Sequence, residues 1–123
     1  MSAGNHFNTE ARALNMRRVD LTTSSSVTTY TAKTGRPADA FVFDRFVTVT
    51  TTSGNNMTIT LPDGVAYGQR FEVLFEVEGN SETVDVTSST GDSATQMTGA
   101  GGYTILEWHG STIGWCEVAS SAT

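Results

Sequence analysis

Cysteine and histidine are nearly absent from this chain, which limits both its cross-links and its metal chemistry. Among 123 residues there is one cysteine, Cys116, and there are two histidines, His6 and His109. A single cysteine excludes an intramolecular disulfide. A structural zinc site takes four nitrogen or sulfur ligands, so these three side chains cannot build one within a single chain. We therefore expect no metal and no cofactor, and a fold that is held together by packing.

Long apolar runs are also missing. No stretch approaches the ~18 consecutive apolar residues of a membrane-spanning helix. The first residues, Met1 to His6, lack the apolar segment of a secretory signal. We therefore expect a protein that has no membrane partner and is made in the cytoplasm.

Signals for catalysis are weak. Acid–base catalysis needs two carboxylates that converge in a cleft, whereas Glu72, Glu76 and Glu78 share a strand face that a solvated surface explains. Ser111 lacks the Gly-x-Ser-x-Gly spacing of a nucleophile elbow. The glycine-rich segment 99–102 precedes a predicted strand, so it offers no helix N-terminus to a phosphate. We expect no enzymatic activity.

Charge is distributed unevenly along the chain. Residues 1–45 hold six basic and four acidic side chains, a net charge of +2, whereas residues 46–123 hold one basic and nine acidic side chains, a net charge of −8. An acidic body repels phosphate backbones, so we expect no nucleic-acid partner. An acidic partner would be met by the first part of the chain.

Threonine and serine are abundant, and helix-forming residues are scarce after Arg18. Turn residues recur every ~8–12 positions, a spacing typical of a β-sandwich or small barrel. We predict one all-β domain of about seven or eight antiparallel strands. We find no exact internal repeat and no β-α-β alternation.

Apolar residues alternate with polar ones in several segments, which predicts strands. The clearest is 70–78, where Phe71, Val73, Phe75 and Val77 form one apolar face. Segment 41–50 is apolar on both faces near its start, which favours burial against a second layer or a neighbouring subunit. We expect it to form a hairpin with segment 57–61, and segments 103–108 and 113–118 to form the last hairpin.

Residues 1–38 are interpreted as an N-terminal arm and linker, and residues 39–123 as the β module. Segment 8–18 could form a short helix, with Asn8 as its N-cap and arginines in its last turn. A helix of about eleven residues is marginal in water. We therefore expect the arm to gain order against another surface.

Trp108 and Trp115 allow two interpretations. Exposed aromatic residues bind sugars, so the pair could form a carbohydrate platform together with Tyr103 and the loop around Asp92. Tryptophans in alternating strands are more often core or interface residues. The sequence does not establish whether the two rings share a face, and we favour packing.

One pattern in the last two-thirds of the chain resembles a known class of protein. A short strand closed by Leu61-Pro62-Asp63-Gly64 is followed by a Gly-Gln-x-Phe-x-Val strand at 68–73, by turns rich in Gly, Ser and Thr, and by a terminal hairpin with two tryptophans. This pattern, over about residues 40–118, resembles a module of tailed-bacteriophage structural proteins, namely head decoration proteins, head fibres and tail-fibre tips.

The resemblance implies a capsid decoration, or cement, protein on the virion surface, bound to the major capsid protein and assembled as a homo-oligomer, with a trimer expected. It implies no reaction. The alternative is a receptor- or glycan-binding module of a head fibre or tail-fibre tip. As capsid-binding arm residues we predict Arg12, Leu14, Met16, Arg17 and Arg18. As core or subunit-packing residues we predict Phe41, Phe71, Phe75, Trp108 and Trp115.

Overall fold

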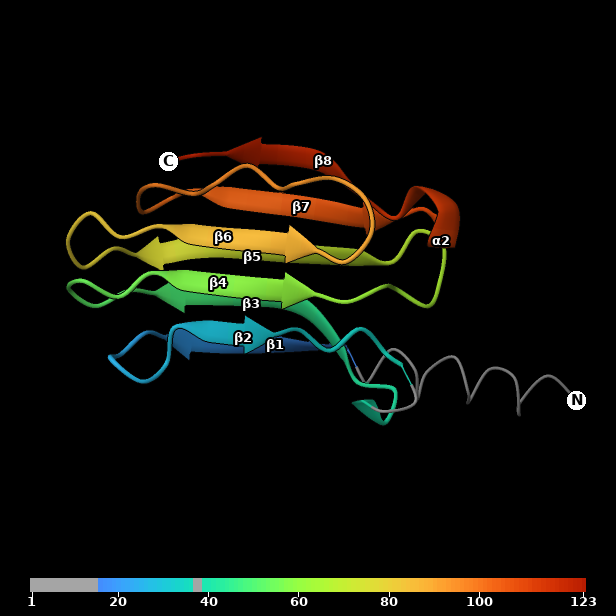
Figure 1. Cartoon of the computed structure of the whole chain (residues 1–123), viewed down its shortest axis with the longest axis horizontal. Coiled ribbons are helices and arrows are strands. Elements are labelled where there is room, and N and C mark those ends of the chain that lie inside the picture. Colours follow the sequence, from blue (N-terminus) through green and yellow to red (C-terminus); the bar gives the residue numbers. More distant parts are fainter. Residues whose placement is uncertain (1–15, 37–38) are drawn as a thin grey trace, which may run out of the picture.

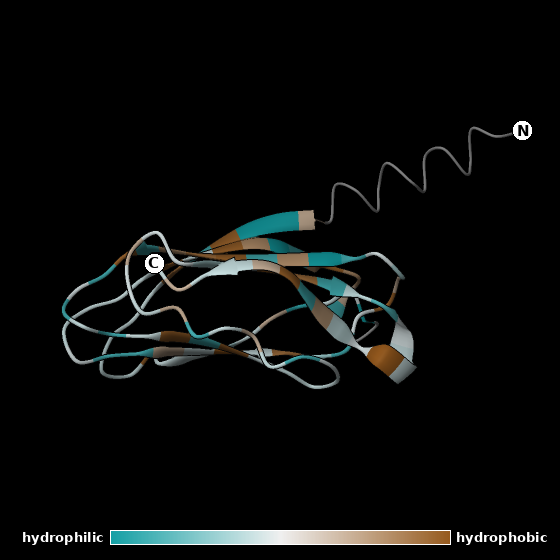
Figure 2. Cartoon of the chain, turned by 90° about the horizontal axis from the view of Figure 1, so that it is seen from above, coloured by the Kyte–Doolittle hydropathy of each residue, from teal (hydrophilic) through white to brown (hydrophobic). Residues whose placement is uncertain are grey.

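The computed structural model describes residues 16–36 and 39–123, and this part of the chain folds into two stacked β-sheets (Figures 1 and 2). Its elements are β1 (Met16–Thr22), β2 (Thr29–Thr31), β3 (Phe43–Thr50), β4 (Met57–Leu61), β5 (Arg70–Val77), β6 (Val84–Ser88), β7 (Tyr103–Trp108), the helical turn α2 (Gly110–Ile113) and β8 (Trp115–Ser121). One sheet has the order β1-β3-β5-β7-β8 and the other β2-β4-β6. The prediction of a mostly β protein is confirmed.

From β1 to β6 the chain alternates between the two sheets, so its path winds around one axis as in a solenoid (Figure 1). We call this path the coil. The pairings β1–β3, β3–β5, β2–β4 and β4–β6 are parallel. Among the strands that the structure describes, only the pairs β5–β7 and β7–β8 are antiparallel. The prediction of an antiparallel sandwich is therefore wrong for most pairings, and no closed barrel forms in the described part of the chain.

The predicted hairpin between segments 41–50 and 57–61 is also wrong. β3 and β4 lie in different sheets, and the turn between them is closed by the isolated bridge of Thr52 with Asn55. The turn residues at 53–56 thus connect one sheet to the other. A tight turn reverses the chain both in a hairpin and in such a connection, so the turn residues do not distinguish the two. The last hairpin, formed by β7 and β8, is confirmed.

The coil creates a structural repeat that is not visible as sequence identity. Val19 pairs with Val47, which pairs with Val73, and in the other sheet Tyr30 pairs with Ile59. Each turn of the coil is about 27 residues long, within the range of repeats in solenoid proteins. Successive turns of the coil share apolar side chains at inward positions, whereas outward partners such as Arg18, Phe46 and Glu72 differ, which is why no repeat is found in the sequence.

The core lies between the two sheets and is formed by the inward rows of these strands. Fully buried side chains include Val49 and Phe75 from one sheet and Met57, Ile59 and Leu61 from the other. Val19 and Leu21 of β1 and Tyr30 of β2 pack against the same core and are partly buried. Residues 16–36, placed in the arm by the sequence analysis, thus supply the first turn of the coil.

The two outer edges of the stacked sheets differ. Segment 89–98 runs between the outer strands β6 and β8, with hydrogen bonds between Met97 and Val84 and from Asp92 N to Trp115 O. That side of the stack is closed. On the other side, β1 and β2 are the outermost strands of their sheets, and no strand among the described residues pairs with their free edges. We call this side the open edge.

A buried carboxylate joins two corners of the coil. Glu82 accepts hydrogen bonds from the Thr51 hydroxyl at 2.8 Å, the Asn80 amide at 2.7 Å and the Gly54 amide at 3.0 Å. Burial by itself would raise the pKa of Glu82, but these hydrogen bonds outweigh it and the pKa is lowered. Glu82 therefore stabilises the turns at 51–56 and 78–83 only while it is ionised.

We expect acid to destabilise the fold through such carboxylates. Hydrogen bonds from Ser89 and Thr90 lower the pKa of Asp63, and those from Thr95 and Thr104 lower that of Glu117 against the effect of burial. Because these pKa values are lower in the folded chain, their contribution is complete above the unfolded pKa of about 4 and is lost as pH falls through the folded values.

The measurement is the urea midpoint of unfolding at pH 7, 5, 4 and 3. We expect it to fall below pH 5, and to fall less steeply in Glu82→Gln, which removes one titrating group. Glu78→Gln is the control, because Glu78 makes no ion pair and no side-chain hydrogen bond within the described residues 16–36 and 39–123. A midpoint that stays constant down to pH 3 would contradict the assignment.

Candidate functional site

The described residues form a groove at the end of the molecule where β1, β3 and β5 begin, which is also the end that carries α2 (Figure 1). We call this end the Met16 end. The groove has a volume of about 350 Å³. It is lined by side chains from the starts of these strands and from the loop between β4 and β5, namely Met16, Phe43, Arg45, Ala66, Tyr67, Gly68, Gln69 and Arg70.

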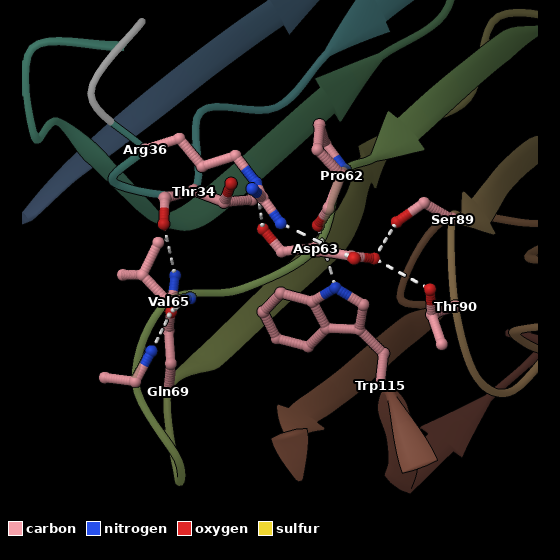
Figure 3. Close-up of polar contacts among 10 residues, drawn as sticks. Thr34, Arg36, Pro62, Asp63, Val65, Gln69, Ser89, Thr90 and Trp115 are labelled. Carbon is pink, nitrogen blue, oxygen red and sulfur yellow. Dashed lines mark hydrogen bonds and ion pairs between the residues drawn. The ribbon is translucent and has the colours of Figure 1, made fainter. Parts of the chain in front are cut away.

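The β4–β5 loop is held in place by Gln69. Its side-chain carbonyl accepts hydrogen bonds from the amides of Val65, at 2.9 Å, and Ala66, at 3.3 Å, and its amide group donates to Thr34 O at 3.0 Å (Figure 3). The loop therefore presents Tyr67 outward on a fixed backbone. Tyr67 is 77% exposed, the most exposed large hydrophobic side chain in the described part of the chain.

Tyr67 stacks on His109, with ring centroids 5.3 Å apart and an angle of 13° between the ring planes. His109 in turn lies 2.8 Å from Glu107, which also accepts a hydrogen bond from Arg70 at 3.0 Å. The His109 contact and then the Arg70 contact lower the pKa of Glu107. One face of the Tyr67 ring is thus covered by an ordered polar cluster, and the ring stands beside the groove.

Asp63 connects the loops at the Met16 end. It accepts hydrogen bonds from Ser89 at 2.5 Å and Thr90 at 2.8 Å, and Arg36 lies 3.5 Å from its carboxylate (Figure 3). Next to it, Trp115 Nε1 donates to Pro62 O at 2.9 Å. The Leu-Pro-Asp-Gly turn therefore has a structural role, because its polar groups join three loops to the core tryptophan.

Ion pairs neutralise the basic residues of this structure. Every lysine and arginine within 16–36 and 39–123 has an acidic partner, in the pairs Arg17–Asp44, Arg18–Asp20, Lys33–Asp39, Arg36–Asp63, Arg45–Glu72 and Arg70–Glu107. The excess acidic charge lies on residues without an ion pair in the described part, among them Glu76, Glu78 and Asp85. The groove therefore has no surplus of positive charge in these residues.

The Arg17 pair is the most buried. The Asp44 side chain is fully buried and accepts hydrogen bonds from Arg17 and from the Tyr30 hydroxyl, both at 2.5 Å, and from the Lys33 amide at 2.8 Å. Burial, and then the bond to Asp44, raises the pKa of Tyr30 to about 12. Arg17 thus fastens β1 to β2 and β3.

The predicted arm residues separate into two groups. Arg12 and Leu14 lie outside the described residues, as do residues 8–15 of the predicted helix. Met16 lines the groove, and Arg17 and Arg18 belong to β1. The helix prediction is wrong for residues 16–18, because parallel pairing with β3 satisfies their backbone in an extended form.

The predicted packing residues are buried with one exception. Phe71, Phe75, Trp108 and Trp115 are all core residues. Phe41 is 57% exposed, with a positive φ of 59°, because its segment turns into β3 outside the core. Its assignment to the core is wrong. A role in subunit packing stays a prediction.

The carbohydrate platform proposed for Trp108 and Tyr103 is not formed. Trp108 is 4% exposed and packs against Trp115, with ring centroids 5.4 Å apart. The register of β7 and β8 pairs the two tryptophans directly, which brings both rings to the core face. Tyr103 and Trp108 lie at opposite ends of β7.

Tyr67 and Gln69 were not predicted from the sequence as site residues, and neither was the contact of His109 with Tyr67. Tyr67 lies between two strand patterns, where no periodicity reports its exposure, and its stacking with His109 joins residues 42 positions apart. A lone aromatic residue in a Gly-containing loop was the only available signal.

The chain matches no protein-family model, no curated protein and no solved structure. Among residues 16–36 and 39–123, no group of three or more His, Cys, Asp or Glu side chains is arranged to hold a metal ion. No helix in the described ranges is long and apolar enough to span a membrane.

Proposed function

We propose that this protein is a bacteriophage capsid decoration protein that binds the major capsid protein on the outer surface of the head through its Met16 end. The observation that carries the proposal is the groove at this end, where exposed Met16 and Tyr67 stand together. The segments around it add three more exposed apolar side chains, Phe41, Val65 and Ile113. Apolar residues gathered at one end favour a binding surface.

The ion pairs of β1 make an electrostatic attachment to the capsid less favourable than the sequence predicts. From the sequence, the basic arm is expected to attract an acidic capsid patch, but Arg17 and Arg18 already have carboxylate partners. Attachment at the Met16 end would therefore rely on burial of apolar surface, with Tyr67 as its central side chain. Aromatic anchors of this kind often dominate the binding energy of an interface.

The proposed mechanism is bridging without a chemical reaction. Each copy would bury its Met16 end on the capsid, and association of several copies would add their contacts, so that a modest affinity per site suffices. The protein would then be located on the virion, in many copies per particle. The resemblance of residues 40–118 to phage structural modules supports this proposal, as does a compact two-sheet body suited to a mechanical role.

The test is occupancy of decoration-free heads by the full chain and by Tyr67→Ala. We expect this substitution to weaken binding by about 30-fold, the effect of a 2 kcal/mol anchor. Tyr103→Ala is the matched control, since Tyr103 is also exposed but lies at the far end of β7. Raising the salt from 0.05 to 0.5 M should change the occupancy little.

Two outcomes would contradict the proposed surface. Binding that is lost at high salt, or in Arg12→Ala/Arg18→Ala with Tyr67 intact, would assign attachment to the basic residues. Equal binding of all variants would place attachment elsewhere on the body. Arg17 is left unchanged in this set because its removal would leave Asp44 buried without its cation.

Glycan binding is a second candidate, and the exposed Tyr67 ring is the observation that favours it. Its stacking on His109 holds the ring in one orientation beside the polar groups of Arg70 and Glu107. Sugars bind to such aromatic faces. Here Tyr67→Ala would abolish binding to host-cell polysaccharide and leave head occupancy unchanged, which separates the two candidates.

A further inference from the structure

The open edge of β1 has a defined set of backbone groups that no strand within residues 16–36 and 39–123 pairs with. Thr23 N donates to Thr50 O, so Thr23 and every second residue before it direct their backbone groups toward β3. The alternate residues direct their N–H and C=O groups away from the sheet, namely Met16, Arg18, Asp20 and Thr22. A seven-residue edge with such free groups is a template for another strand.

The side chains on this edge are self-complementary in charge. Arg18 and Asp20 lie two positions apart on the same face of β1, and their side chains are 56% and 66% exposed. If β1 pairs with β1 of a second copy in an antiparallel register centred on Val19, Arg18 lies opposite Asp20 of the other copy, twice. Opposite charges directly across a strand pair are stabilising.

We propose that two copies of this chain associate through their β1 edges in this register, which joins their larger sheets into one continuous sheet. All four outward residues then pair with outward residues: Met16 with Thr22, and Arg18 with Asp20. The register thus allows up to about eight backbone hydrogen bonds across the two-fold axis. The proposal does not rest on the proposed capsid function.

Neighbouring registers are disfavoured by the same two side chains. A register centred on Arg18 places the two Arg18 side chains opposite each other, and one centred on Asp20 does the same for the two carboxylates. Like charges directly opposite are destabilising. A shift by one residue would pair outward backbone groups with groups already bonded to β3. Only the Val19-centred register satisfies both the charges and the hydrogen bonds.

A second copy fits this edge better than an unrelated strand. When two copies of β1 run antiparallel, each Arg18 faces an Asp20, so the charges of the edge are complementary to themselves. Isologous pairing of one edge with itself requires a two-fold axis. We therefore infer a dimer in place of the trimer that the family resemblance implies. Pairing would also remove an exposed edge that otherwise invites open-ended association.

The experiment reverses the charge of Arg18 or of Asp20, one at a time, in the full-length chain. The mass of each variant is measured by analytical ultracentrifugation at micromolar concentration. Arg18→Asp places two pairs of carboxylates across the interface, and Asp20→Arg places two pairs of guanidinium groups there. We expect each variant to weaken dimerisation by about 10- to 100-fold. Glu78→Arg, an equal charge change outside β1, should leave the dimer intact.

Mixing the two variants is the decisive step. In an Arg18→Asp/Asp20→Arg heterodimer every facing pair is again of opposite charge, so we expect the mixed sample to recover the dimer. The ion pair within each chain stays broken on mixing, so recovery can come only from contacts between chains. A monomeric unmodified protein, or a mixture that stays monomeric, would overturn the proposal, as would a trimer unaffected by either reversal.

Discussion

Replacing Phe75 with alanine is expected to lower the free energy of unfolding by about 3–5 kcal/mol, the cost of a buried aromatic side chain and its cavity. Phe75 is 0% exposed, pairs with Val49 across the parallel strands and belongs to the core between the two sheets. Its backbone is held by the parallel ladder with β3 and by hydrogen bonds with Gly101 and Gly102, so the surroundings cannot collapse into the space without breaking these bonds. The measurement is the urea midpoint at constant m-value.

The control for this substitution is Val77→Ala, two positions along the same strand. Val77 is 48% exposed, so its truncation should cost less than about 1 kcal/mol. If the two variants unfold at the same urea concentration, the burial of Phe75 in the core is wrong.

The second large effect is expected for Gly114→Ala. Gly114 has a φ of +84°, and a Cβ placed there would lie closer than 3.0 Å to the backbone of Thr90 and Gly91. Those atoms belong to the segment that closes the strand stack, where Thr90 O accepts a hydrogen bond from Trp115 N at 2.9 Å. Backbone strain and displacement of this segment should together cost about 3–5 kcal/mol.

Gly54→Ala separates strain from contact. Gly54 has nearly the same φ, +82°, but a Cβ there would meet nothing within 4 Å. Its replacement should cost only about 1 kcal/mol of backbone strain. Equal losses in the two variants would mean that the approach of segment 89–98 to β8 does not stabilise the fold.

Much of the local structure could be predicted from the sequence. Alternation at 70–78 located β5 and its buried face, since Phe71, Val73 and Phe75 are core residues. The last hairpin was also found, because its two strands are close in sequence and their pairing depends on a short turn. Phe41 was assigned to the core wrongly. Its aromatic side chain is typical of a strand, but its backbone has a positive φ and β3 begins only at Phe43.

The candidate site could be predicted only in part. Met16 was singled out as an arm residue, and it lines the groove. Its partners there, Tyr67 and Phe43, come from the next two turns of the coil, and nothing local connects them. The ion pairs were equally hidden: Arg17 meets Asp44 across 27 positions, which made the first segment seem more basic than its surface is.

The sequence by itself determined where most strands after residue 43 lie, most of their inward side chains and where the chain turns, because these depend on period-two polarity and on residues a few positions apart. It did not determine β1, which lies in a segment predicted as arm and helix and is extended because it pairs with β3. The tertiary structure decided which sheet each strand joins and in which direction it runs. A tight turn such as 52–55 serves a hairpin or a corner equally well, and the choice depends on burial of the inward rows against strands about 27 residues away. The groove at the Met16 end and the open edge at β1 both follow from the sheet that each strand joins.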